Sequence, residues 1–459
     1  MPRIEPTSTA ANPCSSETPA NADVEDRGRV FDNSKPESIY HMFFQVAVPF
    51  SIAGLGMVCA GIAFDMVKNW KLFVEVRETF ILVPALCGLK GNLEMTLASR
   101  LSTLTNCGHM DNSKKRNGTL LSNVALNQIL ATVIALFAST FAIILHLITY
   151  GQLNWAHVCL LSAASVATAC CTSMTLDIIM ILIVIFSRKC GINPDNVATP
   201  VAASIGDLTT IIALSMFGTL FLNHTSTKPW INIVFVLVVI LISPLWIRQA
   251  LRDDRTKKML FKGWIPVISA MLLSSGGGQI LEKGALDYAE LPKFQPVING
   301  VGGNLVAVQA SRLSTYFHQN ALPGEIPNGY KLKHFCSIKR AFFSRDNDAQ
   351  SVRVLLSLVM PGHIIFNCFL YIFRSDSAAP PQGILFTAMY LTAALTQVLV
   401  LLYVCQYMIA AMWSWRVDPD NAAIPYLTAL GDLLGSLFLF LVFLLFDKLH
   451  LQRLQVPLF

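Results

Sequence analysis

The sequence predicts an all-α polytopic membrane protein, and three observations support that fold class. Hydrophobic residues make up 54% of the chain and charged residues only 14%, whereas soluble domains carry nearer a quarter charged residues. Apolar runs of roughly 20 residues recur along the chain, and each is long enough to cross the hydrocarbon core as a helix. Two distinctive motifs occur once in each half of the chain. A duplicated helical membrane unit explains all three.

The apolar runs, bounded by charges and turn residues, predict about eleven membrane spans. In chain order they cover residues 43–64, 79–101, 120–147, 155–187, 197–222, 231–250, 263–282, 294–314, 353–373, 384–413 and 422–446. The first five and the last five form matching sets, with one span between them. Equivalent helices are then six crossings apart and run in the same direction. This predicts two parallel five-helix repeats, related by a pseudo-two-fold axis along the membrane normal.

The spans divide the chain into five predicted segments. The N-terminal segment is polar, mixed in charge and rich in Ser and Pro, which is typical of a disordered tail and contains no cleavable signal peptide. The segments are a tail at 1–40, a first repeat at 41–225, a linker helix at 226–260, a second repeat at 261–446 and a C-terminal tail at 447–459. Because both repeats are present, one chain is expected to function alone.

Basic residues predict the orientation in the membrane. They concentrate in alternate loops, around Lys114–Arg116, Arg188–Lys189, Arg248–Lys262 and Lys331–Arg353. The positive-inside rule then places these loops and the N-terminus in the cytosol. The net charge of +6 is therefore a topology signal, and we expect membrane lipid but no nucleic acid as a partner.

One motif places an acidic residue at membrane depth in each half. It reads Asn-Pro-Asp-Asn-x-x-x-Pro from Asn193 and Asp-Pro-Asp-Asn-x-x-x-Pro from Asp418. A Gly-Asp pair follows, ending at Asp207 and at Asp432. Asp207 lies 12 residues beyond Asp195, or ~18 Å along a helix, which is near the bilayer midplane. An intramembrane acid is costly, so it is usually functional.

Two carboxylates that meet in a low dielectric repel each other, and a divalent cation relieves that conflict. Oxygen ligands without a Cys/His set favour Mg²⁺ or Ca²⁺ over zinc or copper, and Mg²⁺ commonly keeps several waters beside one or two carboxylates. The alternative for the two mid-membrane acids is a buried, hydrogen-bonded carboxyl. The acids at the helix starts could equally complement the helix N-terminus, and Asn193 or Asp418 could act as N-caps. The predicted metal ligands are Asp207, Asp432, Asn196, Asn421, Asp195 and Asp420.

The second motif is glycine-rich and runs from Gly88 to Thr103 and from Gly300 to Thr315. Its glycines favour close helix packing, while its asparagines could bond neighbours or orient a hydrated ion. For Glu94, an acid without a match in the other half, contact with an ion pathway and pairing with a buried polar group stay open. The predicted pore-lining or supporting residues are Asn92, Asn304, Asn193, Asp418, Pro200, Pro425, Gly206, Gly431, Gly91, Gly303 and Glu94.

A remote alternative from another class is an intramembrane aspartyl protease, because Pro84-Ala85-Leu86 superficially matches a motif of that family. However, Ser204 and Ala429 replace the first glycine of Gly-x-Gly-Asp, and the sequence has no Tyr-Asp dipeptide. We therefore expect no enzyme activity.

The glycine-rich sequence from Gly88 to Thr103 and the motif from Asn193 to Pro200 closely resemble those of solute carrier family 41, the animal relatives of bacterial MgtE magnesium transporters. The resemblance covers about residues 40–446 and both repeats. It implies Mg²⁺ transport through a pore between two five-helix domains. It also implies that Asp207 and Asp432 occupy the Mg²⁺-binding position of the bacterial pore. Asn193, Asp195, Asn196 and their second-half partners would lie near its cytosolic mouth.

The bacterial relatives are homodimers with large cytosolic Mg²⁺-sensing domains, and no segment here is long enough to form one. We expect a plasma-membrane Mg²⁺ transporter that exchanges Mg²⁺ for Na⁺ and mediates Mg²⁺ efflux. Mg²⁺ is then the transported substrate and Na⁺ the coupling ion. A non-coupled Mg²⁺ channel is the alternative.

Overall fold

The computed structural model describes most of the chain as helix. The described residues are 39–106, 113–151, 154–190, 194–225, 228, 230–326, 332–373 and 384–455. Within these ranges the chain forms fifteen α-helices and no β-strand. The predicted tail at 1–40 lies outside them, apart from its last two residues.

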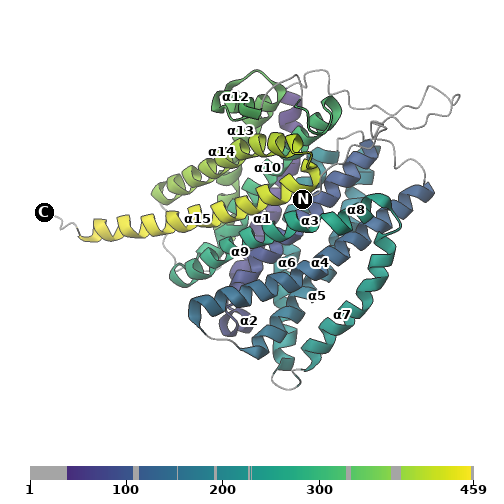
Figure 1. The fold of residues 1–459 in the computed structure, drawn as a ribbon. Coiled ribbons are helices and arrows are strands. Elements are labelled where there is room, and N and C mark those ends of the chain that lie inside the picture. Colours follow the sequence, from purple (N-terminus) through teal and green to yellow (C-terminus); the bar gives the residue numbers. More distant parts are fainter. Residues whose placement is uncertain are drawn as a thin grey trace.

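In chain order the helices are described as a first half, a linker and a second half (Figure 1). The first half contains α1 (Ile39–Val67), α2 (Lys71–Glu75), α3 (Thr79–Asn106), α4 (Ser113–Tyr150), α5 (Trp155–Lys189) and α6 (Pro194–Thr225). The linker contains α7 (Trp230–Ala250) and α8 (Asp254–Lys262). The second half contains α9 (Trp264–Asp287), α10 (Leu291–Asn320), α11 (Leu332–Phe335), α12 (Ile338–Phe343), α13 (Asn347–Ile372), α14 (Ile384–Ser414) and α15 (Pro419–Gln455).

Among the described residues, ten helices are long and apolar enough to cross a membrane. They match ten of the predicted spans. The remaining span, 294–314, falls inside α10, which is helical throughout but is not among the ten. Polar side chains such as Asn299, Asn304 and Gln309 lower its hydropathy, and all three are buried within the protein. The helix α15 continues to Gln455, past the predicted span end at 446.

The two halves make the same pattern of helix contacts. In the first half α6 packs against α1, α3 and α5, and in the second half α15 packs against α9, α10 and α14. Between the halves, α1 packs against α10 and α13, while α9 packs against α3 and α4. The first helix of each half, α1 or α9, therefore packs against the second and third long helices of the other half, and the two sets of contacts correspond. A two-fold relation between duplicated units would produce this pattern.

The linker helix α7 has no counterpart in this scheme. It lies along the edge of the molecule (Figure 1) and packs on α4 and α5. Only 6% of its apolar window is buried. A helix that is apolar on all sides and exposed is suited to face lipid.

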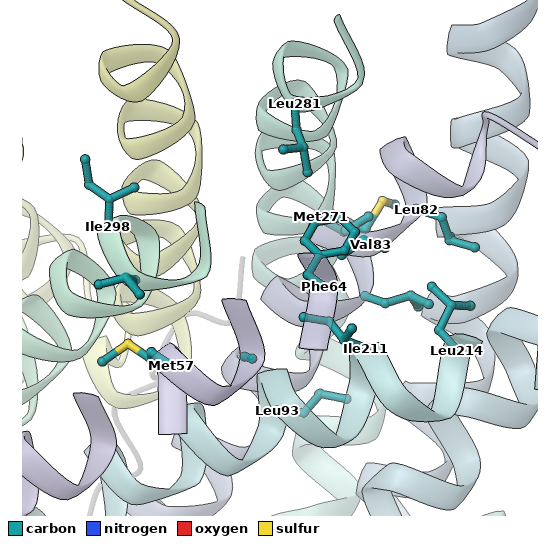
Figure 2. Close-up of a cluster of buried hydrophobic side chains, with 14 of the residues drawn as sticks. Met57, Phe64, Leu82, Val83, Leu93, Ile211, Leu214, Met271, Leu281 and Ile298 are labelled. Carbon is teal, nitrogen blue, oxygen red and sulfur yellow. The ribbon is translucent and has the colours of Figure 1, made fainter. Parts of the chain in front are cut away.

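One hydrophobic core joins the two halves. The cluster in Figure 2 combines side chains from α1, α3 and α6 with others from α9 and α10. Its members include Met57, Phe64, Leu82, Val83, Leu93, Ile211, Leu214, Met271, Leu281 and Ile298. Because the shared core is continuous, the halves pack as one body around their interface.

A cluster of two carboxylates and two histidines also connects the halves at the predicted outer helix ends. Glu78 Oε1 lies 3.0 Å from His157 Nδ1 and 3.8 Å from His146 Nε2. The other nitrogen of His146 lies 3.4 Å from Glu282 Oε1 on α9. Pairing offsets the cost of burying these carboxylates, so the cluster ties α9 to the first half.

Candidate functional site

A cavity lies where α3, α6, α10 and α15 meet, and both mid-membrane acids line it. Asp207 comes from α6 and Asp432 from α15, so each half contributes one carboxylate. The cavity has a volume of about 40 Å³. Of the other predicted residues, Gly91 on α3 and Gly303 and Asn304 on α10 also line it. The two sequence motifs of each half therefore meet in one place.

The glycines of α3 allow the helices to approach the acid of the second half. A Cβ at Gly88 would lie 2.7 Å from Asp432 Oδ2 and 2.5 Å from Ser274 Oγ. At Gly91, one turn further, a Cβ would meet nothing within 4 Å. Gly88 thus makes room for the carboxylate, while Gly91 leaves the cavity wide.

Side chains from three other helices hold Asp432 and its backbone. Ser274 Oγ on α9 donates a hydrogen bond of 2.9 Å to Asp432 Oδ2. Asn299 Nδ2 on α10 donates to the Asp432 carbonyl at 3.2 Å, and Gln397 Nε2 on α14 donates to the Gly431 carbonyl at 2.9 Å. Sequence reasoning missed these three residues. The available signal was a polar side chain inside each predicted apolar span.

Two asparagines on α10 offer oxygen acceptors beside the cavity. Asn299 and Asn304 both line it, and the amide oxygen of each is buried without a hydrogen-bond partner among the described residues. An unsatisfied buried acceptor is costly unless water or an ion completes it. The cavity itself is large enough to hold water beside these groups.

The remaining predicted residues lie elsewhere or fall outside the described part of the chain. Gly206 is buried against Leu176, Gly431 packs beside Gly303, and Glu94 is fully buried but does not line the cavity. Pro425 lies inside α15. Asn193 lies outside the described residues, as do the side chains of Asn92, Asp195, Asn196, Pro200 and Asn421.

Asp418 and Asp420 do not line the cavity but contact a histidine that sequence reasoning did not select. His318, near the end of α10, hydrogen-bonds Asp418 Oδ1 at 3.2 Å and lies 3.4 Å from Asp420 Oδ2. Burial opposes protonation of this imidazole, but the hydrogen bond to Asp418 and the charge of Asp420 raise the pKa of His318 to about 9. The acids at the start of α15 thus belong to a separate polar cluster.

The unmatched acids of the first half belong to another buried network. Asn127 Nδ2 donates to Asp177 Oδ1 at 2.8 Å, and Arg100 Nη2 donates to Asn127 Oδ1 at 3.4 Å. Arg100 also interacts electrostatically with Glu94. The Arg100 guanidinium thus joins this buried network through Asn127 and also contacts Met259 Sδ on α8 at 3.9 Å.

The long apolar helices and the acid-lined internal cavity define a polytopic α-helical membrane protein with a candidate cation site between its halves. The sequence profile of the MgtE family, described as a divalent cation transporter, matches residues 83–217 and 295–442. The matched residues make up more than half of the chain. The chain therefore belongs to the MgtE family of divalent cation transporters.

Similar proteins carry a consistent name. Solute carrier family 41 member 2 of Xenopus laevis is 44% identical over 424 residues, covering 91% of this chain and 75% of that protein. The Homo sapiens protein of the same name is 44% identical over 409 residues, covering 89% and 71%. Solute carrier family 41 member 3 of Rattus norvegicus is 43% identical over 417 residues, covering 89% and 88%.

Proposed function

We propose that this protein carries Mg²⁺ across the membrane through a site formed by Asp207 and Asp432. The observation that carries the proposal is that these two acids, one from each half, line a single internal cavity. Mg²⁺ prefers oxygen ligands and retains water. The cavity is lined by two carboxylates and two asparagine side chains, and it has space for water.

The duplicated organisation makes such a site possible in one chain. The proposed repeats are 41–225 and 261–446, with 226–260 as the linker that restores the direction of the second repeat. The corresponding helix contacts in the two halves support this division. Asp195, Asn196, Asp420 and Asn421 at the starts of α6 and α15 are the proposed cytosolic entrance, since each lies about three turns before a cavity acid.

For the transport mode we propose exchange of Mg²⁺ for Na⁺, with Mg²⁺ leaving the cell across the plasma membrane. The related proteins are named solute carriers, and a carrier mode favours coupling over free conduction. Purified protein in liposomes loaded with Mg²⁺ is expected to release it several-fold faster when Na⁺ is present outside than when choline replaces it. Equal rates in Na⁺ and choline, with flux still present, would indicate the channel.

Ser274 is expected to position Asp432 for the ion. Ser274→Ala removes the side-chain hydroxyl that donates to that carboxylate, and a hydrogen bond to a charged group typically contributes about 1.5–3 kcal/mol. We therefore expect roughly a tenfold or greater rise in the Mg²⁺ concentration for half-maximal flux. The matched control is Ser275→Ala, because Ser275 Oγ bonds only its own helix at Met271. An unchanged concentration dependence in Ser274→Ala would contradict this role.

A further inference from the structure

A second set of metal-ligand side chains lies outside the cavity, at the predicted cytosolic end of the second half. His318 stands near the end of α10, Asp418 immediately before α15, and Asp420 in the first turn of α15. One ligand atom from each of the three lies within 4.8 Å of the others. A single atom, His318 Nε2, approaches both an Asp418 oxygen and an Asp420 oxygen, at 3.2 Å and 3.4 Å. Three ligand atoms from two helices thus converge on one point.

The side chains are held in this arrangement by their neighbours. The His318 ring packs edge-on against Trp413, with ring centroids 4.7 Å apart. Trp413 is fixed in turn because its Nε1 donates to the Leu322 carbonyl at 3.1 Å. Asp418 Oδ1 accepts the backbone N–H of Asp420 at 3.1 Å. The cluster is therefore pre-organised, which lowers the entropic cost of binding an ion.

The cluster is accessible as well as ordered. The side chains of His318 and Asp418 are 31% and 29% exposed, whereas that of Asp420 is 12% exposed. An ion could enter from the solvent side and retain water in its open coordination positions. An imidazole nitrogen beside two carboxylate oxygens suits Mn²⁺, Co²⁺ or Zn²⁺, whereas Mg²⁺ prefers oxygen ligands alone.

The first half does not repeat this ligand set. When Arg100 is aligned with Arg312, the residue matching His318 is Asn106, and in the alignment of the two Asx-Pro-Asp-Asn motifs Asn193 matches Asp418. At the sequence position of His318, the first half therefore has an asparagine in place of a histidine. An ion bound by His318 belongs to one half only and is distinct from an ion shared by the two cavity acids.

We propose that His318, Asp418 and Asp420 form a binding site for one divalent transition-metal ion. The ion takes the place of the proton shared between His318 Nε2 and the carboxylates, so binding releases that proton. It cross-links the end of α10 to the start of α15, the helix that carries Asp432. The inference does not depend on which ion crosses the membrane.

The test is a Co²⁺ titration of the purified full-length protein in detergent, in the presence of excess Mg²⁺. We expect one saturable equivalent, seen as Co²⁺ d–d absorption, with affinity lowered at least about tenfold in His318→Asn. That variant introduces the residue type found at the matching position of the first half, Asn106. The matched control is His224→Asn, a histidine in the last turn of α6, far in sequence from the proposed ligands. A second control, Asp432→Asn, tests whether the bound Co²⁺ lies in the cavity instead. Both are expected to bind Co²⁺ as the unmodified protein does.

Three results would overturn the site. They are no saturable Co²⁺ binding by the unmodified protein, equal binding by His318→Asn, and loss of binding in His224→Asn. If His318→Asn does not fold, pulsed EPR of the unmodified protein with one equivalent of Mn²⁺ decides the question. Coupling to an imidazole nitrogen supports the site, and its absence contradicts it.

Discussion

Replacing either Asp207 or Asp432 by Asn is expected to reduce Mg²⁺ flux by roughly thirtyfold to more than a thousandfold. Each change removes one of the two negative charges that line the cavity while preserving the size of the side chain. Losing one partner of a buried charge contact typically costs about 2–5 kcal/mol, and about 1.4 kcal/mol corresponds to a factor of ten. Either loss alone is expected to be sufficient, because the proposed site shares one cation between both acids.

The measurement is Mg²⁺ uptake into liposomes containing equal amounts of purified protein, with folding checked by size-exclusion chromatography. Asp447→Asn is the matched control, since Asp447 is an exposed acid further along α15, and normal flux is expected for it. Near-normal flux in both cavity variants would contradict the site. If only Asp432→Asn is impaired, the acids do not act as a pair.

Gly278→Ala is expected to destabilise the packing between the halves. A Cβ on this residue of α9 would lie 2.6 Å from the backbone oxygen of Ile81 on α3, and 3.2 Å from its Cα. Backbone atoms cannot rotate away as a side chain does, so the two helices must separate. Overpacking of this kind typically costs about 1–3 kcal/mol. A clear fall in the melting temperature of the detergent-solubilised protein is therefore expected.

Gly118→Ala on α4 provides the comparison, because a Cβ there would meet nothing within 4 Å. Alanine is the better helix former, so this variant should melt at the same temperature as the unmodified protein or higher. A melting temperature for Gly278→Ala equal to that of Gly118→Ala would show that α9 and α3 are not in close contact at this point.

Much of the fold could be predicted because membrane helices leave a strong signal in the sequence. Apolar length alone located ten spans. The predicted span 294–314, which lies in α10, is not among these ten. Its polar residues lower the mean hydropathy of the helix. In such a helix, residues such as Asn299 and Asn304 are buried by other helices and not exposed to lipid. Hydropathy does not distinguish these two environments.

The site was predictable in part for a similar reason. A carboxylate at membrane depth is too costly to be incidental, so Asp207 and Asp432 could be selected from spacing alone. Ser274 and Gln397 could not, since serine and glutamine in apolar helices commonly bond their own or neighbouring backbone. Only packing shows that they reach Asp432 and Gly431.

By itself the sequence determined the helical membrane architecture, the paired motifs and the choice of the two acids, because these depend on local composition and on spacing along the chain. Tertiary structure alone decided that α1 and α9 cross between the halves and that both acids line one cavity. It alone also brought His318 to Asp418 and Asp420. Such contacts join residues about a hundred or more positions apart, and they depend on how helices pack in three dimensions, which local pattern does not encode.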